Sequence, residues 1–272
     1  MQHAEQSLKQ RYGGLQPPGA LCLNPVITLM LQHRSVRDFS DRPLPSETLA
    51  TLVAAGQSAS TSSNMQMVSV VAVTDADRRL RLSQAAGGQA FVAQAPLVLC
   101  FVVDQARPAR IGDALGADLF ALPMLDTFLA AASDCAIFAQ SVALAAESLG
   151  LGCCFVGNLR NDPEFVAEEL RLPPGAFVIF GLCIGYEGER VTGIRPRLPQ
   201  SVVLHHETYR TSQEEDAALA HYDEVFARHE LSQGRPASGW RARHRDRLAS
   251  ECYLAGRDRL RDILGRLGFA LK

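Results

Sequence analysis

The sequence predicts an α+β or α/β fold in which a sheet lies between layers of helices. Three observations support this. Val-rich segments of strand length recur along the chain, amphipathic helical segments lie between them, and turn residues separate the two kinds. The 272 residues, of which 47% are hydrophobic and 21% charged, suit one large soluble domain or two small ones with a sizeable core.

The N-terminal third is expected to be mostly helical. Residues 1–24 predict a loose extension, because QPPG at 16–19 interrupts regular structure. The apolar spacing of residues 25–33 predicts a short helix. A second helix is expected to begin at Ser46, a natural N-cap, and to end near Gly56.

Strands and helices are expected to alternate from residue 60 onward. STSSNMQ (60–66) reads as a polar loop, and the alternating, Val-rich segment 67–75 as a strand. Residues 76–86 form an amphipathic helical pattern that ends at Gly87 and Gly88. The continuous apolar run 95–104 is typical of a strand buried on both faces.

The longest helical pattern covers residues 117–149, with a break at Pro123. Its part from 126 onward is Ala-rich and apolar almost all round, which predicts a helix buried on several sides, in the core or at a subunit interface. Asp134 within it is expected to be capped or to face an interface rather than to be catalytic. Gly150 and Gly152 are expected to end this helix.

The C-terminal half continues the alternation. Residues 151–160 predict a short strand that enters a Gly-containing loop, and Asp162 and Pro163 are the N-cap and first residue of a helix. Residues 176–186 predict a buried strand, and RPRLP (195–199) a basic loop. A helix at 214–231 precedes a polar loop (232–239) and Arg-rich helical sequence to the end.

Composition argues against several classes of function. A formal net charge of −2 is not that of a nucleic-acid-binding domain. No apolar run reaches the ~18 residues that span a bilayer, and the polar N-terminus has no apolar signal core, so we do not expect secretion. The seven cysteines are scattered without CxxC, so buried, reduced thiols in the cytoplasm and no metal site are expected. GxGxxG, GxxxxGK[ST], GxSxG and a catalytic triad are absent.

Four polar clusters are candidates for chemistry. They are His33, Arg34, Ser35 and Arg37; Ser60, Thr61, Ser62, Ser63, Asn64 and Gln66; Phe155, Val156, Gly157, Asn158, Leu159 and Arg160; and Arg195 and Arg197. Arginine forks bind phosphate, and backbone at a glycine turn can approach a planar ring closely. Together the clusters suit a phosphorylated cofactor with a polar heterocycle, although each alone is also typical of a solvated loop or helix end.

Several of these segments resemble one family. HRSVRDFSDRPLP (33–45) resembles the opening motif of the FMN-dependent nitroreductase family. Six further segments, in order along the chain, resemble the subgroup of oxygen-insensitive NADPH nitroreductases and NADPH:FMN reductases. They are STSSNMQ, GGQAFVAQAP (87–96), AAESLGLGCCFVGNLRN (145–161), FGLCIGY (180–186), RPRLPQSVVLHHETY (195–209) and HYDEVF (221–226). The resemblance implies an α+β three-layer sandwich, with a mixed, mostly antiparallel sheet between helices, in an intertwined homodimer. It makes 25–272 one FMN-binding domain after the extension 1–24.

The resemblance also implies which residues contact FMN at the subunit interface. They are His33, Arg34, Ser35, Arg37, Gln89, Phe155, Val156, Gly157, Asn158, Arg195 and Arg197, with Thr61, Ser62, Ser63 and Asn64 from the other subunit. Arg34 and Ser35 would lie toward the phosphate. Arg37 would stabilise the negative charge that two-electron reduction leaves near the pyrimidine edge. No side chain is implied as a catalytic acid or base.

The electron donor implied is NADPH. In the subgroup a mobile loop, here 232–247, supplies an arginine for the 2′-phosphate; Arg235 is the candidate, with a solvated helix face as the alternative interpretation. Four positions differ from the subgroup pattern: Gln233 replaces an arginine, Asn64 an aromatic or apolar residue, Asn158 a glycine and Arg195 a lysine. We expect these changes to weaken the preference for NADPH, to place the Asn158 side chain at the flavin edge and to alter acceptor choice.

The implied function is hydride transfer from NADPH to FMN, followed by two-electron reduction of nitroaromatics, quinones or free flavin in the same pocket. A reductive dehalogenase-type relative and a non-catalytic flavin-binding or redox-sensing module are the alternatives. The expected partners are a second copy of the chain and small-molecule electron acceptors, without nucleic acid or membrane.

Overall fold

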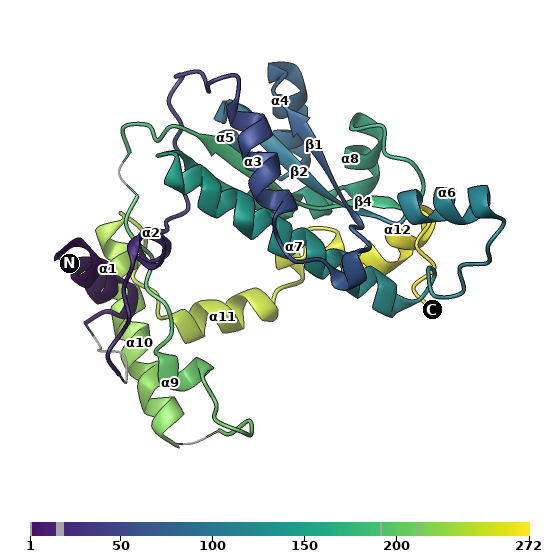
Figure 1. Ribbon diagram of the computed structural model, residues 1–272. Helices are drawn as coiled ribbons and strands as arrows, with labels where there is room; N and C mark the ends of the chain where they lie inside the picture. The colour runs from purple at the N-terminus through teal and green to yellow at the C-terminus, as the bar shows by residue number, and fades with distance from the viewer. Residues whose placement is uncertain (1, 15–18, 191, 212) are drawn as a thin grey trace. The chain divides into compact units, whose positions relative to one another are not determined.

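The computed structural model describes residues 2–14, 19–190, 192–211 and 213–272 (Figure 1). The chain divides into two compact units. The sheet unit comprises residues 35–190 and 254–272, and the helical unit comprises 1–34 and 191–253.

A four-stranded antiparallel sheet, in the order β1-β2-β4-β3, is the centre of the sheet unit. Its strands are β1 (Val68–Val73), β2 (Leu97–Asp104), β3 (Gly152–Val156) and β4 (Ala176–Gly185). All four predicted strands are therefore confirmed. Among the described residues, parallel pairing is limited to one isolated bridge, which joins Ser35 to Cys153 of the edge strand β3.

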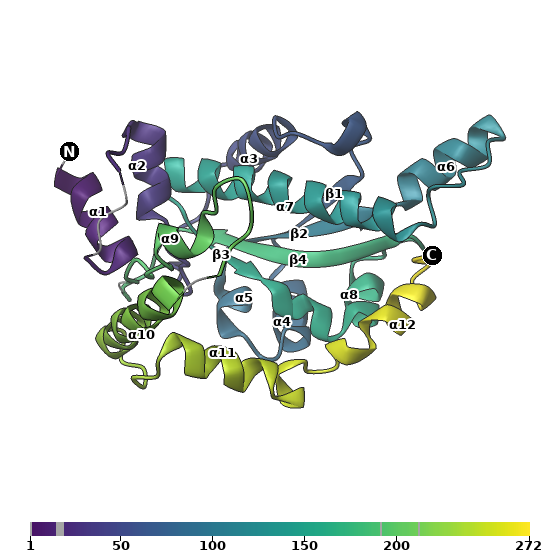
Figure 2. The same ribbon diagram turned by 90° about the horizontal axis from the view of Figure 1, so that it is seen from below.

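Helices cover both faces of this sheet, which makes the fold a three-layer α+β sandwich (Figure 2). Leu99 and Phe101 of β2 point into a core with α3 (Thr48–Gln57) and α7 (Leu125–Ser148). Cys100 and Val102 point into a second core with α4 (Ala76–Ala85), α5 (Ala90–Gln94) and α8 (Pro163–Glu169). Every residue of β2 is buried, because side chains alternate between two covered faces.

Helix α7 confirms the long Ala-rich helix, which begins after Pro123 and is followed by Gly150 with φ 73°. One side, including Cys135 and Ala139, packs in the sheet core. The opposite side exposes apolar residues, among them Leu129 and Ile137, so within one chain the helix is buried on one side. Among the described residues, α7 is the one helix whose length and composition would allow it to cross a membrane. In its apolar 18-residue window, 33% of the residues are buried.

Two helix boundaries differ from the prediction. Helix α3 begins at Thr48 with Glu47 as N-cap, and the Ser46 hydroxyl bonds the Glu47 carboxylate at 3.1 Å instead of capping the helix. Helix α6 (Ala106–Leu115) was not predicted, because Pro108 and Gly112 obscure its pattern. The Asp104 carboxylate at the end of β2 accepts the Arg107 N–H at 2.9 Å, which starts the helix.

The C-terminal segment belongs to the sheet unit. After the 3₁₀ turns Glu251–Tyr253 and Arg257–Arg259, α12 (Leu260–Arg266) places Leu264 in the α7-side core. Phe269 packs edge-on against Phe128 of α7, with ring centroids 5.4 Å apart. The backbone N–H of Lys272 donates to the Pro123 carbonyl at 3.0 Å, which fastens the end of the chain beside the start of α7.

The helical unit contains α1 (Gln2–Tyr12), α2 (Pro25–Gln32), α9 (Gln200–Val203), α10 (Gln213–Ser232) and α11 (Trp240–Leu248). Helix α1 corrects the prediction of a loose extension. The buried Arg11 guanidinium donates to the carbonyls of Leu31 (3.0 Å), His33 (2.7 Å) and Arg195 (2.7 Å). The QPPG segment follows this helix and therefore does not prevent it.

Candidate functional site

The predicted contacts of the sheet unit fall into two groups: one surrounds the edge strand β3, and the other is the loop before the edge strand β1. The β3-edge group holds seven of them: Ser35, Arg37, Gln89, Phe155, Val156, Gly157 and Asn158. The Val36 N–H donates to the Cys153 carbonyl at 2.9 Å, so residues 35–37 run alongside β3. Val36 itself is buried, which fixes this segment and leaves Arg37 at the surface.

Arg37 is an exposed cation in the β3-edge group. Its guanidinium carbon lies 5.8 Å from the centroid of the Phe91 ring, and Phe91 is two residues beyond Gln89 on α5. Its guanidinium also makes a long hydrogen bond, 3.4 Å, to the carbonyl of its neighbour Ser35. Among the described residues no carboxylate lies within 4.0 Å of Arg37, so its charge is available to an anionic ligand.

The loop after β3 completes this group. Phe155 is 38% exposed and packs edge-on against Phe180, with centroids 5.5 Å apart. The Asn158 amide donates to the Ala86 carbonyl at 3.4 Å, at the end of α4. Asn158 thus joins the loop to α4, and its place at the flavin edge stays a prediction.

The second group is the Thr61–Asn64 loop, which a buried carboxylate of α7 holds in place. Asp134 is 2% exposed and accepts three donors: the Thr61 hydroxyl at 2.5 Å, the Ser62 hydroxyl at 2.8 Å and the Ser62 N–H at 2.9 Å. Of the two expectations for Asp134, a capped side chain or one at an interface, these hydrogen bonds support the first. Three residues of this segment adopt positive φ: Ser63 (50°), Asn64 (55°) and Gln66 (51°). L-residues disfavour this region, so the bonds to Asp134 hold a strained loop.

The two groups belong to different parts of the sheet unit. The Thr61–Asn64 loop leads into β1 and is bonded to α7, and the other group surrounds β3. The strands β2 and β4 lie between the edge strands β1 and β3, which three strand spacings separate by roughly 14 Å.

The helical unit holds the remaining predicted residues: His33, Arg34, Arg195, Arg197 and Arg235. The His33 carbonyl and the Arg195 carbonyl both accept from Arg11. Arg235 lies beyond α10 and pairs with Glu230 at 2.8 Å, and Arg195 approaches the same carboxylate at 3.5 Å. The predicted loop 232–247 is helical from Trp240 onward.

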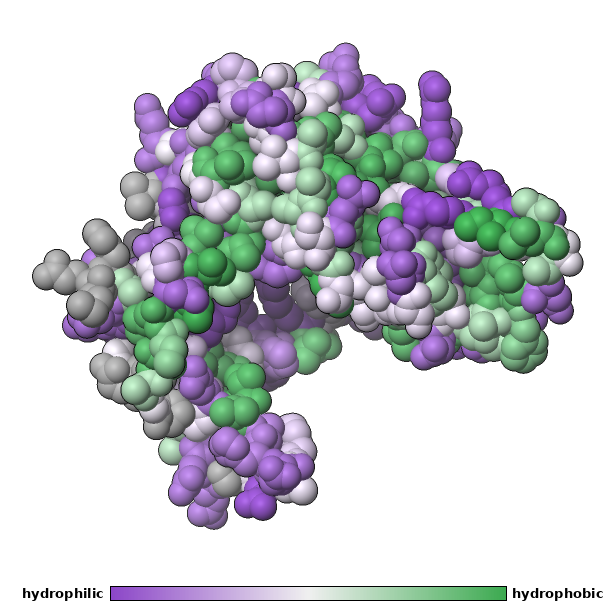
Figure 3. All heavy atoms as spheres, in the orientation of Figure 1, coloured by the Kyte–Doolittle hydropathy of each residue, from purple (hydrophilic) through white to green (hydrophobic). Residues whose placement is uncertain are grey.

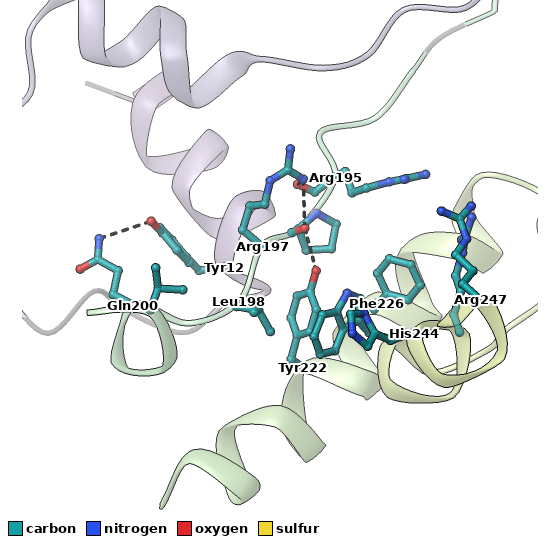
Figure 4. Close-up of a pocket in the computed structure, with 13 residues that line it drawn as sticks. Tyr12, Arg195, Arg197, Leu198, Gln200, Tyr222, Phe226, His244 and Arg247 are labelled. Atoms are coloured by element: carbon teal, nitrogen blue, oxygen red, sulfur yellow. Dashed lines mark hydrogen bonds between the residues drawn. The ribbon is translucent and has the colours of Figure 1, made fainter. Parts of the chain in front are cut away.

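A cavity of about 590 Å³ lies beside Arg195 and Arg197 (Figure 4). Aromatic side chains form much of its wall, and the Tyr222 hydroxyl donates to the Pro196 carbonyl at 2.9 Å. Burial raises the pKa of Tyr222. Phe226, His244 and Arg247 lie at one end of the cavity and Tyr12 at the other (Figure 4). Cationic and aromatic side chains together suit a flat, anionic ligand.

The cysteines offer no nucleophile in the sheet core. Burial raises the pKa of Cys100, Cys135 and Cys153 to about 12, and that of Cys183 well above its ordinary value. These thiols stay protonated at neutral pH and pack as small apolar groups, as expected from the sequence. Cys22 and Cys252 are exposed, which corrects the expectation of burial for these two.

Sequence reasoning missed three residues that shape these groups. Phe91 lies beneath Arg37, Arg11 ties α1 to the Arg195 segment, and Glu230 gathers several arginines. Their roles depend on residues distant in the chain, and only Glu230, an acid close to an Arg-rich segment, carried a signal in the sequence.

Comparisons with known proteins show the family of this chain. The nitroreductase family model matches residues 30–186, and the family's C-terminal domain model matches residues 195–272. The NADPH-flavin oxidoreductase of Vibrio harveyi is 37% identical over 231 residues, which cover 84% of this chain and 93% of that protein. The oxygen-insensitive NADPH nitroreductase of Salmonella typhimurium is 37% identical over 213 residues, which cover 78% and 85%.

A solved structure also has the same fold as this chain. The NADPH:FMN oxidoreductase from Vibrio harveyi, in complex with NAD⁺, aligns with a TM-score of 0.80 and 35% identity. The alignment covers 92% of this chain and 100% of that chain. With both family models matched along most of its length, the chain belongs to the nitroreductase family.

Proposed function

We propose that the protein is an FMN-dependent NAD(P)H oxidoreductase that transfers hydride from NADPH to FMN and then reduces a small acceptor by two electrons. The relatives named as NADPH-flavin oxidoreductase and NADPH nitroreductase support this function. The observation that carries it is the β3-edge group, in which Arg37 exposes an unpaired charge beside residues that match the family's cofactor motifs.

The residues present fit FMN. The β3-edge group offers a cation, a hydroxyl at Ser35, an amide at Gln89 and a glycine turn at Gly157, which suit the polar edge of a flavin ring. FMN held here would supply two-electron redox chemistry. Arg37 would stabilise negative charge at its ring, and the exposed Phe155 would offer an apolar surface. Hydride transfer of this kind needs no protein nucleophile, in keeping with the buried thiols.

The site that we propose is completed by a second copy of the chain. Two observations support a homodimer. The β3-edge group surrounds one edge strand and the Thr61–Asn64 loop precedes the other, so the partner subunit's loop would have to reach the β3 edge. The outer side of α7 also exposes apolar residues, including Leu129 (54% exposed) and Ile137 (45%).

The exposed apolar surface extends beyond α7. Hydrophobic side chains gather over α6 and the start of α7, at the right of the view in Figure 3. They include Ile111 (54% exposed), Leu115 (75%) and Phe120 (77%). Apolar area of this kind on a soluble chain is typical of a subunit interface.

NADPH is the proposed donor, and the arginines around Arg235 are its proposed 2′-phosphate contacts. Gln233, which stands where the subgroup has an arginine, leaves that recognition to other residues. Nitroaromatics, quinones and free flavin are the proposed acceptors. The proposal places the enzyme in the cytoplasm, with small molecules and its own second copy as partners.

The test is the absorption spectrum of the purified protein, followed by steady-state kinetics with NADPH and a quinone or nitroaromatic acceptor. Bound flavin and parallel double-reciprocal plots are expected, because donor and acceptor use one pocket in turn. A flavin spectrum without any NADPH turnover would instead favour the flavin-binding module, and a colourless protein that does not take up FMN would contradict the proposal.

A further inference from the structure

Helix α1 lies before residue 30, where the match to the nitroreductase family model begins, yet it is docked in the helical unit. Ala4, Ser7 and Arg11 are only 4%, 5% and 6% exposed, and their spacing of three and four places them on one face of the helix. Gly13, just after α1, has φ 64°, and a Cβ at this position would overlap the Val225 side chain of α10. The end of α1 is therefore fitted closely against α10.

Arg11 bonds two segments of the helical unit that are far apart in the sequence. Its guanidinium donates to the carbonyls of Leu31 (3.0 Å) and His33 (2.7 Å), at the end of α2, and to the Arg195 carbonyl (2.7 Å). Its own carbonyl accepts the Arg197 N–H at 2.8 Å. Because one residue reaches both segments, the end of α2 and residues 195–197 lie side by side.

The first of these contacts caps α2. The last carbonyls of a helix have no partner within it and carry partial negative charge, which a guanidinium satisfies. His33 is the C-cap of α2, so Arg11 fixes the direction in which the chain leaves the helix. The next residue is Arg34, which we expect at the phosphate end of FMN.

The second contact fixes the backbone on both sides of Pro196. The Arg195 side chain approaches Glu230 at 3.5 Å. The Arg197 side chain, among the described residues, bonds only the carbonyls of Arg195 (3.2 Å) and Pro196 (3.3 Å), so its charge is available to an anion. Figure 4 shows Tyr12, the last residue of α1, beside the same segment, where its hydroxyl accepts from the Gln200 amide at 3.3 Å.

We propose that Arg11 is a positioning residue for the phosphate end of FMN, which acts by joining the end of α2 to residues 195–197. Arg34 and Arg197 are then held on adjacent backbone before the ligand arrives. Two arginine forks placed in advance bind phosphate oxygens at a lower cost in lost side-chain freedom. The inference rests on the proposed function, because it takes FMN as the ligand, and it makes α1 a supporting part of the cofactor site.

The experiment measures the affinity of the full-length apoprotein for FMN and for riboflavin, which lacks the phosphate, by quenching of flavin fluorescence. Arg11→Met removes the guanidinium but keeps an unbranched side chain. Arg11→Lys keeps the charge, but an ammonium donates from one nitrogen and cannot span the three carbonyls as a planar fork does. Lys9→Met is the matched control, because it removes the same charge from an exposed residue of the same helix.

We expect Arg11→Met to weaken FMN binding roughly tenfold and to change riboflavin binding by less than about twofold, because only the phosphate end loses its positioning. Arg11→Lys should fall between Arg11→Met and the wild type. Lys9→Met should bind both flavins like the wild type.

Three results would overturn the proposal. The first is wild-type FMN affinity in Arg11→Met. The second is an equal loss of FMN and riboflavin binding, which would show general damage to the fold instead of lost positioning at the phosphate. The third is an equal effect of Lys9→Met, which would show that net charge alone matters. If Arg11→Met does not fold, Arg11→Lys decides in the same way by its ratio of FMN to riboflavin affinity.

This inference and the proposed function fail in different ways. If NADPH reduces the bound flavin but the Arg11 variants bind FMN like the wild type, the role of Arg11 is wrong and the enzyme function stands. If the Arg11 variants lose FMN affinity selectively but NADPH never reduces the flavin of the wild type, the enzyme function is wrong and the role of Arg11 stands.

Discussion

Asp134 offers the sharpest test of how the fold positions the Thr61–Asn64 loop. Its carboxylate is buried in α7 and accepts the hydroxyls of Thr61 and Ser62 and the N–H of Ser62. Replacing it with alanine leaves these donors without their acceptor. The hydroxyls can turn to water, but the fixed N–H cannot, and a buried donor without a partner costs about 1–3 kcal/mol.

The loss of charge-assisted bonds adds to this cost, while the removal of a buried carboxylate offsets part of it. We therefore expect Asp134→Ala to lower the free energy of unfolding by about 3 kcal/mol. Asp134→Asn keeps an oxygen for the Ser62 N–H and should lose only about 1–2 kcal/mol. The strained backbone at Ser63 and Asn64 should then relax, and FMN affinity should fall with it.

Urea unfolding followed by circular dichroism measures the stability, and flavin fluorescence measures the affinity. Ser133→Ala is the matched control, because Ser133 is the neighbouring residue of α7, is exposed, and bonds only the Leu129 carbonyl one turn earlier. It should change stability by less than about 0.5 kcal/mol. Asp134→Ala with wild-type stability and wild-type FMN affinity would refute this account of the loop.

Three further predictions concern packing, assembly and pH. Gly56→Ala should destabilise the protein by about 1–3 kcal/mol, because the added Cβ meets an aromatic ring of α7. Gly265→Ala should stabilise the protein by up to about 1 kcal/mol, because the space around this residue of α12 is open. Chemical denaturation measures both changes. Ile137→Glu on the outer side of α7 should give a monomer, measured by light scattering, and should weaken FMN binding. Leu80→Glu, on the exposed side of α4, should leave the dimer intact. Hydrogen bonds from Arg81 and Arg78 lower the pKa of Glu169 from 4.5 to about 2, so its contribution to stability is full above pH 4.5 and disappears as the pH falls toward 2. Glu169→Gln should therefore be less stable than the wild type near neutral pH, and this difference should shrink through that range in pH-dependent unfolding.

Much of the sheet unit follows from local sequence. The alternation of β2 between two cores requires apolar residues from Leu97 to Val103, which is the pattern of 95–104 up to its last residue, Asp104. Helix α7 follows from its Ala-rich composition. Helix α6 does not, because Pro108 and Gly112 obscure its helical pattern, even though the carboxylate that accepts from its first turn, Asp104, is only three residues before Arg107.

The site residues divide in the same way. Motifs point to Arg37, to the Thr61–Asn64 loop and to the turn at Gly157, since each is a short segment with a distinctive pattern. What holds these segments is not local: Asp134 is 73 residues from Thr61, and Arg11 is 184 from Arg195. These contacts join residues far apart in the sequence and form only when the chain has folded, so the spacing of residues along the sequence does not predict them.

The central claim is that NADPH reduces an FMN held by this protein. Anaerobic stopped-flow mixing of the holoprotein with NADPH tests it directly. The account predicts that the visible absorption band of the bound flavin disappears in a single turnover and returns when a quinone is added. A bound flavin whose absorption does not change with excess NADPH would contradict it.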